Sequence, residues 1–502
     1  MTASAERNLY DEIPYPSFAL PQTHPDRLAT LATLFGMRPA PIDRCRVLEL
    51  GCGDGANLIP MALTLPGSAF VGIDLAARPI ARGTAMAAAL GLRNIALHQQ
   101  DIQEISEEIG AFDYIVAHGL YSWVPPPIRE KILAICATHL HANGVAYVSY
   151  NTYPGGRLRE ITRELMTFHT RGVTDPRAKI AQARAVIRAV ADAASGEGIH
   201  AAIQRDQHER IAALSDAAIF HDYLAAVNAP VYFHQFAQQA ADHGLRYLAE
   251  ADFFEMRERD NPSPIAEALN DAGEDDRIAR EQYRDFLRGR AFRQTLLCHQ
   301  DVTLDRTVNP ARLVDLFIAS PVRARAPAPD IHSPSPETFV GLTGAEMTTN
   351  HPLAKAALRA LGEQWPQAIH FPALLALATE NSGTADDEGA RLLANVVLGA
   401  YTAGLIELHV QPLPFTLRVS ATPLASPLAR LQLRDGPIVT SLRHTSVRMD
   451  DIRGSALLEL LDGTRDLAAL REALAARGLS DAGEQDVQRD LIRIAHLALL
   501  IA

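Results

Sequence analysis

The sequence has few cysteines and no long apolar segment. Four cysteines occur among 502 residues (Cys45, Cys52, Cys136 and Cys298), too few for the disulfide framework of a small secreted domain. No run of about 20 apolar residues occurs, as a membrane-spanning helix would require. The first residues, MTASAERNLYDEIPYPS, contain no apolar core of signal-peptide length. We therefore expect a cytoplasmic protein that does not span a membrane.

Positive charge is also in short supply. The chain has 47 Lys and Arg against 59 Asp and Glu, which gives a formal net charge of −12. Such a surface repels a phosphate backbone, which argues against non-specific nucleic-acid binding. The composition is otherwise that of an ordinary globular protein, with 48% hydrophobic and 21% charged residues. The length predicts two to four domains.

Short apolar segments alternate with helical segments between residues 46 and 150. The apolar segments are RVLEL (46–50), AFVGID (69–74), NIALHQ (94–99), FDYIVA (112–117) and VAYVSY (145–150). Apolar residues recur at helical spacing in the segments between them. This alternation predicts an α/β fold with a doubly wound, Rossmann-like parallel sheet and helices on both faces.

The rest of the chain changes pattern several times. Residues 157–231 show only helical patterns, and strand-like segments follow near 245–249 and at 292–299. We interpret the first part as a helical insertion with a regulatory or dimerisation role, and we expect the later segments to complete the first sheet. The predicted domains are a core (1–156), the insertion (157–231), the completion of the sheet with a regulatory segment (232–319), a linker (320–337), a winged-helix-like module (338–412) and a C-terminal α+β module (413–502).

The stretch VLELGCGDGANL (47–58) places Gly51, Gly53 and Gly55 between a strand and a helix. Closely spaced glycines let a backbone approach a ligand. A dinucleotide site requires G-x-G-x-x-G, and here the third glycine comes one residue early. A P-loop ends in GK[ST], and Ala56–Asn57 do not supply that ending. Neither phosphate-binding motif therefore fits.

Acidic residues around the loop point to a different nucleotide. Glu49 precedes the first glycine and Asp54 lies inside the loop. These side chains would repel a pyrophosphate but suit a ligand with an amino group and a sulfonium. Asp74, which ends the second strand 23 residues after Gly51, is placed to bind ribose hydroxyls. Gln100–Asp101–Ile102 after the third strand suits an adenine amine and ring face.

Together, E-x-G-x-G-x-G, the acidic end of strand two and QDI after strand three resemble a class I S-adenosylmethionine-dependent methyltransferase. The resemblance implies that Gly51, Gly53 and Gly55 line the methionine part of S-adenosylmethionine. It implies further that Asp74 binds ribose and that Asp101 with Ile102 binds adenine. We place Glu49 and His118 among the cofactor-binding residues as well. Cys52 lies in the loop without a paired base, so we expect it only to pack.

A narrower resemblance covers most of the chain. YDEIPYPS…THP (10–25), HDYL (221–224), GLRYLAEA (244–251) and FRQTLLCH (292–299) are similar to segments of bacterial methyltransferases that carry a regulatory domain. That group includes rickettsial protein-lysine methyltransferases that act on surface proteins. The C-terminal modules resemble the accessory modules of the same group more weakly.

The methyl acceptor should bind beyond the carboxyl ends of the strands. After strand four the chain offers His118, Tyr121 and Trp123, and after strand five it offers Asn151 and Tyr153. Aromatic faces and an amide or hydroxyl oxygen could hold an amine there. Tyr121, Asn151 and Tyr153 are the candidate catalytic residues; the alternative for Tyr121 and Trp123 is that they pack a loop.

Two further hypotheses concern the N-terminus and the histidines. Tyr10, Asp11 and Tyr15 form either a lid over the cofactor or a packed leader segment. The separations between the histidines of the 208–243 region are 13, 13 and 9 residues, which match no usual chelating pair on one helix. We therefore predict no metal site. These histidines are His208, His221, His234 and His243.

Nucleic-acid substrates are disfavoured by two local patterns. The asparagine-proline-proline-aromatic signature of many nucleic-acid amino-methyltransferases is absent after strand four. The helix expected at 390–404 carries one arginine and no lysine, whereas a helix that reads DNA needs several basic or amide side chains. Protein contact is the better interpretation for this module.

The favoured hypothesis is an S-adenosylmethionine-dependent methyltransferase that transfers a methyl group to an amine, most of all to a protein lysine side chain. The alternatives are a small-molecule N- or O-methyltransferase and a non-catalytic cofactor-binding adaptor. A protein or a small molecule is the expected acceptor, and a homodimer is one expected use of the helical insertion.

Overall fold

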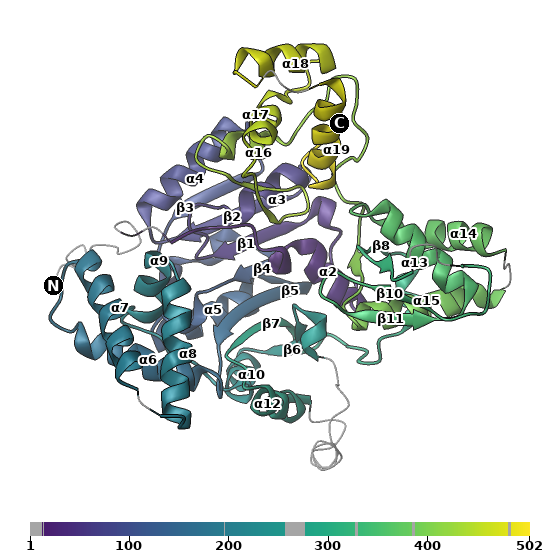
Figure 1. Ribbon diagram of the computed structural model, residues 1–502. Helices are drawn as coiled ribbons and strands as arrows, with labels where there is room; N and C mark the ends of the chain where they lie inside the picture. The colour runs from purple at the N-terminus through teal and green to yellow at the C-terminus, as the bar shows by residue number, and fades with distance from the viewer. Residues whose placement is uncertain are drawn as a thin grey trace.

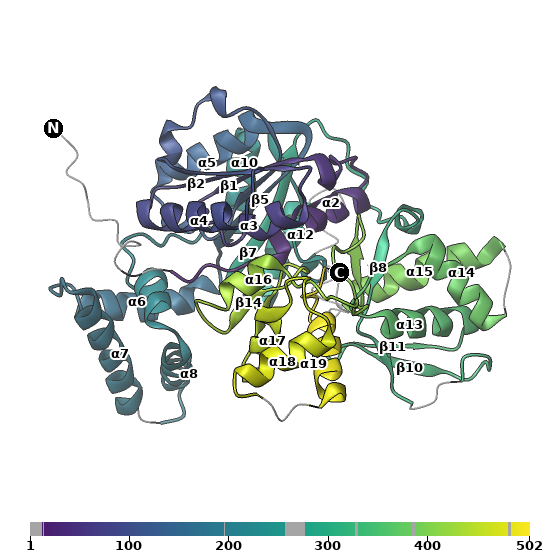
Figure 2. The ribbon, with the colours of Figure 1, turned by 90° about the horizontal axis from the view of Figure 1, so that it is seen from above.

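The protein is divided into a central sheet with its helices, a helical lobe, a middle module and a C-terminal module (Figures 1 and 2). The computed structural model describes residues 13, 15–194, 196–256, 277–326, 330–383, 387–479 and 483–501. In Figure 1 the helical lobe lies to the left of the sheet, the C-terminal module above it and the middle module to its right. Among the described residues, no helix combines the length and apolar character that crossing a bilayer requires.

The central sheet combines parallel and antiparallel strands in the order β3-β2-β1-β4-β5-β7-β6. β1 to β5 are parallel, and β7 is antiparallel to both of its neighbours. The doubly wound sheet is thus confirmed, with residues 292–299 inside it as predicted. In sheet order the strands are Ile95–Gln99, Ala69–Asp74, Arg46–Leu50, Phe112–Ala117, Leu140–Asn151, Phe292–His299 and Leu245–Glu250.

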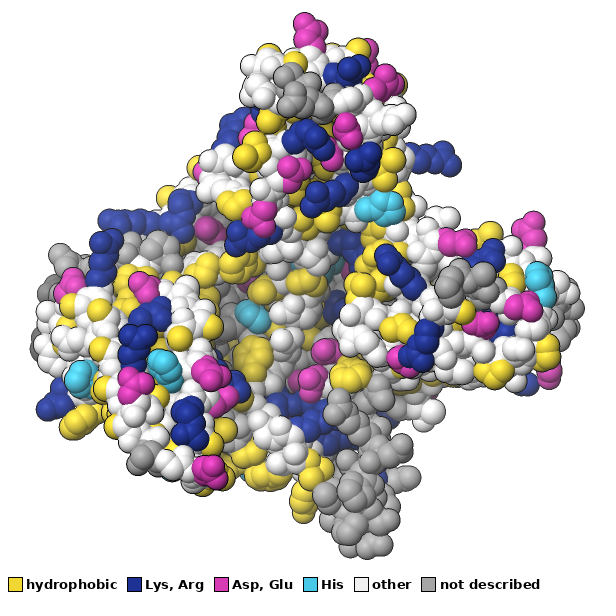
Figure 3. Space-filling model, viewed as in Figure 1, with side chains coloured by type: hydrophobic (Ala, Val, Ile, Leu, Met, Phe, Trp, Pro, Cys, Tyr) yellow, Lys and Arg dark blue, Asp and Glu magenta, His cyan; other side chains and the backbone are white. Residues whose placement is uncertain are grey.

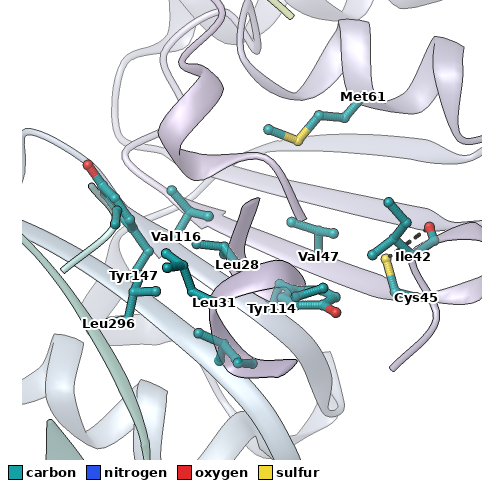
Figure 4. Packing of buried hydrophobic residues seen from close by; sticks show 14 of the residues in the cluster. Leu28, Leu31, Ile42, Cys45, Val47, Met61, Tyr114, Val116, Tyr147 and Leu296 are labelled. Carbon is teal, nitrogen blue, oxygen red and sulfur yellow. Dashed lines mark hydrogen bonds between the residues drawn. The ribbon is translucent and has the colours of Figure 1, made fainter. Parts of the chain in front are cut away.

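Helices cover both faces of the sheet because its inner strands are apolar on both sides. One face packs against α2 (Pro25–Leu34), α3 (Leu58–Thr64) and α4 (Ala77–Ala89). The other packs against α5 (Pro126–His139) and α10 (Phe233–Asp242). Figure 4 shows the first of these cores, where leucines of α2 lie against strand residues. The labelled strand residues of this core are Val47, Tyr114, Val116, Tyr147 and Leu296.

A buried ion cluster fixes α12 (Arg277–Arg288) to the antiparallel edge of the sheet. The Arg293 side chain of β7 is fully buried. Its Nε lies 2.8 Å from Asp285 Oδ2 of α12, and its Nη1 lies 2.5 Å from Glu250 Oε1 of β6. A buried charge is tolerated only where partners compensate for its lost hydration. The pairing of Arg293 with Asp285 therefore holds α12 against the sheet.

The helical lobe consists of α6 (Gly156–His169), α7 (Pro176–Ala193), α8 (Ile199–Ala213), α9 (Asp216–Ala218) and a π-helical turn at Ile219–Tyr223. Apolar residues of these helices form a core of their own. The sequence correctly predicts helices up to Tyr223, whereas residues 224–231 form no helix.

The middle module contains two small antiparallel sheets. The predicted linker over 320–337 is wrong in part, because Arg323–Ala324 forms β9 and pairs with β10. Val322 and Ile318 are buried in the module's own core, which explains why the segment folds despite its prolines. The elements are β8 (Phe317–Ala319), β9, β10 (Glu337–Val340), β11 (Glu346–Thr349), α13 (Pro352–Gln364), β12 (Ile369–His370), α14 (Phe371–Ser382), α15 (Asp387–Thr402) and β13 (Glu407–His409).

The C-terminal module joins a β-hairpin to a helical core. The described residues 416–420 form no strand, and Thr416 N donates instead to Leu500 O. The elements are α16 (Pro427–Gln432), β14 (Ile438–Thr440), β15 (Ser446–Arg448), α17 (Ile452–Leu460), α18 (Leu467–Ala476) and α19 (Glu484–His496).

Candidate functional site

The glycine loop leaves β1 at the carboxyl edge of the sheet. Gly51, Gly53 and Gly55 adopt φ values of +74°, +57° and +72°, a region that residues with a Cβ rarely occupy. A Cβ on Gly53 would lie 3.2 Å from the Ser17 hydroxyl oxygen. The loop therefore requires glycine for its conformation, and at Gly53 a neighbouring chain segment also lies close.

Asp74 ties this loop to the end of β2. Its Oδ2 accepts a hydrogen bond of 2.8 Å from Gly53 N, and its Oδ1 accepts one of 2.8 Å from Ala76 N. The side chain is half-buried. Gln100 N donates to Asp74 O at 2.9 Å, so the ends of β2 and β3 are held together. The acidic residue and the glycines thus form one structural unit, as their spacing indicates.

Glu49 presents one unsatisfied carboxylate oxygen beneath the loop. The side chain is buried, and its Oε1 accepts a hydrogen bond of 2.9 Å from Asn57 Nδ2. Its Oε2 is buried with no hydrogen-bond partner among the described residues. Burial, reinforced by Asp74 and Asp54, raises the pKa of Glu49 to about 8. A buried polar atom without a partner is costly, and a ligand cation would remove that cost.

Asp101 and Ile102 follow β3 at the same edge of the sheet. Asp101 caps the short 3-10 turn Ile102–Glu104 and accepts a hydrogen bond of 2.9 Å from Gln103 N. Both side chains are half-buried, so each keeps surface available to a ligand. Sequence and structure place them beside Asp74 through the pairing of β2 with β3.

His118 follows β4 and contacts two aromatic residues that the sequence analysis did not single out. Its Nδ1 lies 2.9 Å from the Tyr147 hydroxyl oxygen, and its ring stands edge-on to Phe292. Burial lowers the pKa of His118 to about 4, so the imidazole is neutral at pH 7. Tyr147 and Phe292 lie within apolar strand patterns, where no sequence signal distinguishes a site residue from a core residue.

Asn151 and Tyr153 lie at and beyond the end of β5. Asn151 Nδ2 donates to Asn228 Oδ1 at 3.1 Å, and the Tyr153 hydroxyl donates to Glu160 Oε1 at 2.5 Å. Burial, together with Glu160, raises the pKa of Tyr153 to about 12. The guanidinium of Arg157 lies 3.9 Å from the centroid of the Tyr153 ring. Both candidates are therefore positioned by contacts with the lobe side of the molecule.

Tyr121, the third catalytic candidate, is placed elsewhere. Its side chain is fully buried, and its hydroxyl donates to Gln239 Oε1 of α10 at 2.6 Å. The ring packs edge-on to Phe236, also of α10. The prediction that Tyr121 contacts the acceptor is wrong, because the short turn after β4 directs the ring into the core. The alternative of loop packing is correct for this residue.

The N-terminal segment from Tyr15 to Leu20, called the leader below, contacts both the helical lobe and the glycine loop. Tyr10 and Asp11 lie outside the described residues. The Tyr15 hydroxyl donates to Asp222 Oδ2 at 3.4 Å, and its ring stands edge-on to His221. Ser17 then approaches Gly53, and Leu20 N donates to Asn57 Oδ1 at 2.9 Å. The leader thus contacts the lobe first and the glycine loop next.

Family comparisons agree with this geometry. The family described as "Methyltransferase domain" matches residues 47–144, which contain the loop and the ends of β1 to β4. The family "Predicted methyltransferase regulatory domain" matches 215–299, and "PKMT, C-terminal winged helix domain" matches 422–497. The winged-helix match thus falls on the second of the two predicted C-terminal modules.

A relative covers nearly the whole chain. The sequence is 33% identical to the uncharacterised protein RP789 of Rickettsia prowazekii over 97% of this chain and 88% of that protein. The chain belongs to the S-adenosylmethionine-dependent methyltransferases that carry a regulatory domain. The structure of PKMT2 from Rickettsia typhi aligns with this methyltransferase with a TM-score of 0.86 and 28% identity, over 97% of this chain and 100% of that one. The same protein in complex with AdoHcy aligns equally well, at 27% identity.

The residues of this methyltransferase fit its cofactor, S-adenosylmethionine. The unsatisfied Glu49 Oε2 suits the ammonium of the methionine part, and the positive-φ glycines let the backbone approach closely. Asn57, like Tyr147 and Phe292, is a residue at this site that the sequence analysis missed. Its side chain hydrogen-bonds Glu49 instead of capping α3, and the sequence carries no signal for that choice.

Proposed function

We propose that each of the site residues binds a particular part of S-adenosylmethionine. Gly51, Gly53 and Gly55 lie along the methionine part, and Glu49 accepts a hydrogen bond from its ammonium. Asp74 binds the ribose hydroxyls. Asp101 and Ile102 hold the adenine, and neutral His118 lies next to the sulfonium end. The support is the common edge of the sheet on which these residues lie and the free oxygen of Glu49.

We propose that the acceptor is an amine. S-adenosylmethionine would supply the methyl group: the lone pair of a neutral amine would form the new carbon–nitrogen bond as the bond between the methyl carbon and sulfur breaks. The sulfur would leave as the thioether of S-adenosylhomocysteine, and the methylated amine would release a proton to water. A displacement of this kind depends mainly on alignment. Asn151 and Tyr153 supply amide and hydroxyl oxygens toward the amine, and a neutral His118 adds no repulsion.

We propose a protein lysine side chain as the specific acceptor. The observation that carries this proposal is the likeness to PKMT2 over 97% of the chain at a TM-score of 0.86. The molecular surface is hollowed between the helical lobe and the middle module, with apolar side chains on its floor (Figure 3). A hollow of this kind suits a polypeptide segment that presents one long side chain.

Methylation assays test this proposal directly. Radiolabelled S-adenosylmethionine is incubated with the full chain and either a protein extract or a small-molecule extract. Label in protein that survives acid precipitation and is recovered as methyl-lysine after hydrolysis is the expected result. Label only in the small-molecule extract would replace the proposal by small-molecule methylation. Cofactor binding without any label transfer would favour a non-catalytic adaptor.

We propose that the helical lobe serves a homodimer. Leu158, Ile161 and Phe168 of α6 are 46%, 43% and 67% exposed, and their spacing places them on one helical face. Light scattering of the wild type and of Phe168→Glu tests this role, with a loss of dimer expected in the variant. A monomeric wild type would contradict it. We also propose the predicted boundaries of the core (1–156) and of the helical insertion (157–231), and the cytoplasm as the location.

A further inference from the structure

The C-terminal module reaches the cofactor site through one side chain, His444. This residue lies in the turn between β14 and β15 and is buried. Its Nε2 lies 2.8 Å from Asn57 Oδ1, across 387 residues of sequence. Figures 1 and 2 show the module beside α3, whose first turn follows Asn57.

The direction of these hydrogen bonds follows from the backbone N–H of Leu20, which can only donate. Leu20 N can only donate, so the Asn57 atom that it contacts at 2.9 Å is the amide oxygen. Asn57 Nδ2 then donates to Glu49 Oε1 at 2.9 Å. Because Oδ1 accepts, His444 must donate from a protonated Nε2. A chain of hydrogen bonds therefore runs from His444 through Asn57 to Glu49.

The conformation of His444 indicates a specific contact and not casual packing. Its φ is +58°, which is uncommon for a residue with a Cβ. The turn is closed by His444 N donating to Ser441 O at 3.0 Å, and the ring stands edge-on to His24 at 5.1 Å between centroids. Burial lowers the pKa of both histidines, so the uncharged form that donates through Nε2 persists at neutral pH.

Neighbouring contacts hold this turn against the rest of the molecule. Arg443 pairs with Glu407 of β13, and its guanidinium lies 4.0 Å from the centroid of the Trp365 ring. Asp26 of α2 accepts hydrogen bonds from Val410 N at 2.8 Å and contacts His409 Nδ1 at 2.6 Å. The core, the middle module and the C-terminal module thus meet at the position where His444 contacts Asn57.

We propose that His444 is a positioning residue for S-adenosylmethionine, and that the C-terminal module thereby forms part of the cofactor site. His444 fixes the Asn57 amide, and Asn57 holds Oε1 of Glu49 so that Oε2 faces the ligand's ammonium. The proposal rests on the role given to Glu49 under the proposed function. Cofactor affinity then depends on whether the C-terminal module is docked.

Calorimetric titration of the full chain with S-adenosylmethionine tests the proposal. His444→Gly suits the positive φ and removes the donor, and His444→Phe removes the donor while it keeps the volume. Both should weaken binding by about tenfold, the value of about one hydrogen bond to a buried group, and should raise KM for the cofactor with little change in kcat. His444→Asn tolerates the backbone and retains an N–H donor, so it should recover part of the affinity.

Controls separate positioning from general structural damage. Arg448 is an exposed residue of the same hairpin, so Arg448→Ala should bind S-adenosylmethionine like the wild type. Thermal melting without cofactor checks that each variant folds. 5′-Methylthioadenosine lacks the amino-acid part, so its affinity should be equal in the wild type and in His444→Gly. Equal weakening for both ligands would overturn the proposal, because His444 would then act on the whole site.

Glu49→Gln distinguishes failure of this proposal from failure of the proposed function. In the Glu49→Gln background, His444→Gly should weaken binding by much less than tenfold. If Glu49→Gln binds S-adenosylmethionine like the wild type, the role of Glu49 fails and the positioning role fails with it. If Glu49→Gln weakens binding but the His444 variants do not, only the positioning role is overturned.

Discussion

Asp74 Oδ2 lies 2.8 Å from the backbone nitrogen of Gly53 and accepts its hydrogen. One carboxylate therefore both shapes the glycine loop and faces the position proposed for the ribose. Asp74→Ala should lose both functions and weaken S-adenosylmethionine binding by at least about tenfold, since hydrogen bonds to charged groups contribute about 1.5–3 kcal/mol. Asp74→Asn retains an acceptor for Gly53 and should bind better than the alanine variant. Calorimetry measures both, and equal affinity of Asp74→Ala and wild type would contradict the site.

Gly53→Ala should lower the affinity for S-adenosylmethionine, in addition to the loss of thermal stability expected for any alanine at a positive φ. An alanine at φ +57° costs about 1–2 kcal/mol, and its Cβ would press on the Ser17 hydroxyl. Gly91→Ala is the matched control, because Gly91 has φ +67° and nothing within 4 Å of an added Cβ. Both variants should lose similar thermal stability, and only Gly53→Ala should lose affinity. Equal affinities would show that the loop does not contact the ligand.

The pKa of Glu49, raised to about 8 by burial, predicts opposite pH effects on folding and on binding. Between about pH 4.5 and pH 8 the unfolded chain has released the proton of Glu49 and the folded chain retains it, so this group's contribution to stability falls as pH rises. The ammonium of the cofactor requires the carboxylate, so affinity should rise through the same range. Melting temperatures and calorimetry from pH 6 to pH 9 measure the two effects. Glu49→Gln should remove both pH dependences and melt higher at pH 8 without cofactor.

Tyr121→Phe should lower mainly the stability of the protein, and Tyr153→Phe should lower mainly kcat. The Tyr121 hydroxyl bonds Gln239 inside the core, so its removal should cost about 1 kcal/mol of stability and leave kcat nearly unchanged. The Tyr153 hydroxyl lies beyond β5 on the proposed acceptor side, so its removal should lower kcat by about tenfold with less effect on stability. Steady-state kinetics and chemical unfolding of both variants give the comparison. A larger loss of kcat in Tyr121→Phe would restore Tyr121 as a catalytic candidate.

Arg293→Met should strongly destabilise the antiparallel edge of the sheet. The substitution leaves the carboxylates of Glu250 and Asp285 buried beside a neutral side chain. Removing one partner of a buried ion pair costs about 3–5 kcal/mol. Urea unfolding followed by circular dichroism measures the change, with the exposed Arg448→Ala as the control. A change below about 1 kcal/mol would mean that α12 docks without the ion cluster.

The sequence by itself determined the sheet and the cofactor. Alternating apolar and helical segments specify β1 to β5, because the inner strands β1, β4 and β5 bury both faces. The spacing of Glu49, the glycines and Asp74 indicates a nucleoside with an amino group and a sulfonium, and the resemblance to class I methyltransferases that these residues carry implies S-adenosylmethionine. These features can be predicted because the residues that determine them are close together in the sequence.

Only the tertiary structure decided which of these side chains lie at the carboxyl edge of the sheet and which join the core. Tyr121 and Tyr153 are equally plausible in sequence, yet the turn after β4 buries the first against α10. The fold of residues 320–337 depends on pairing with β10 and on burial of Val322. His444 approaches Asn57 only after three modules have docked. Contacts between residues hundreds of positions apart leave no periodicity in the sequence, because their geometry exists only once the chain has folded.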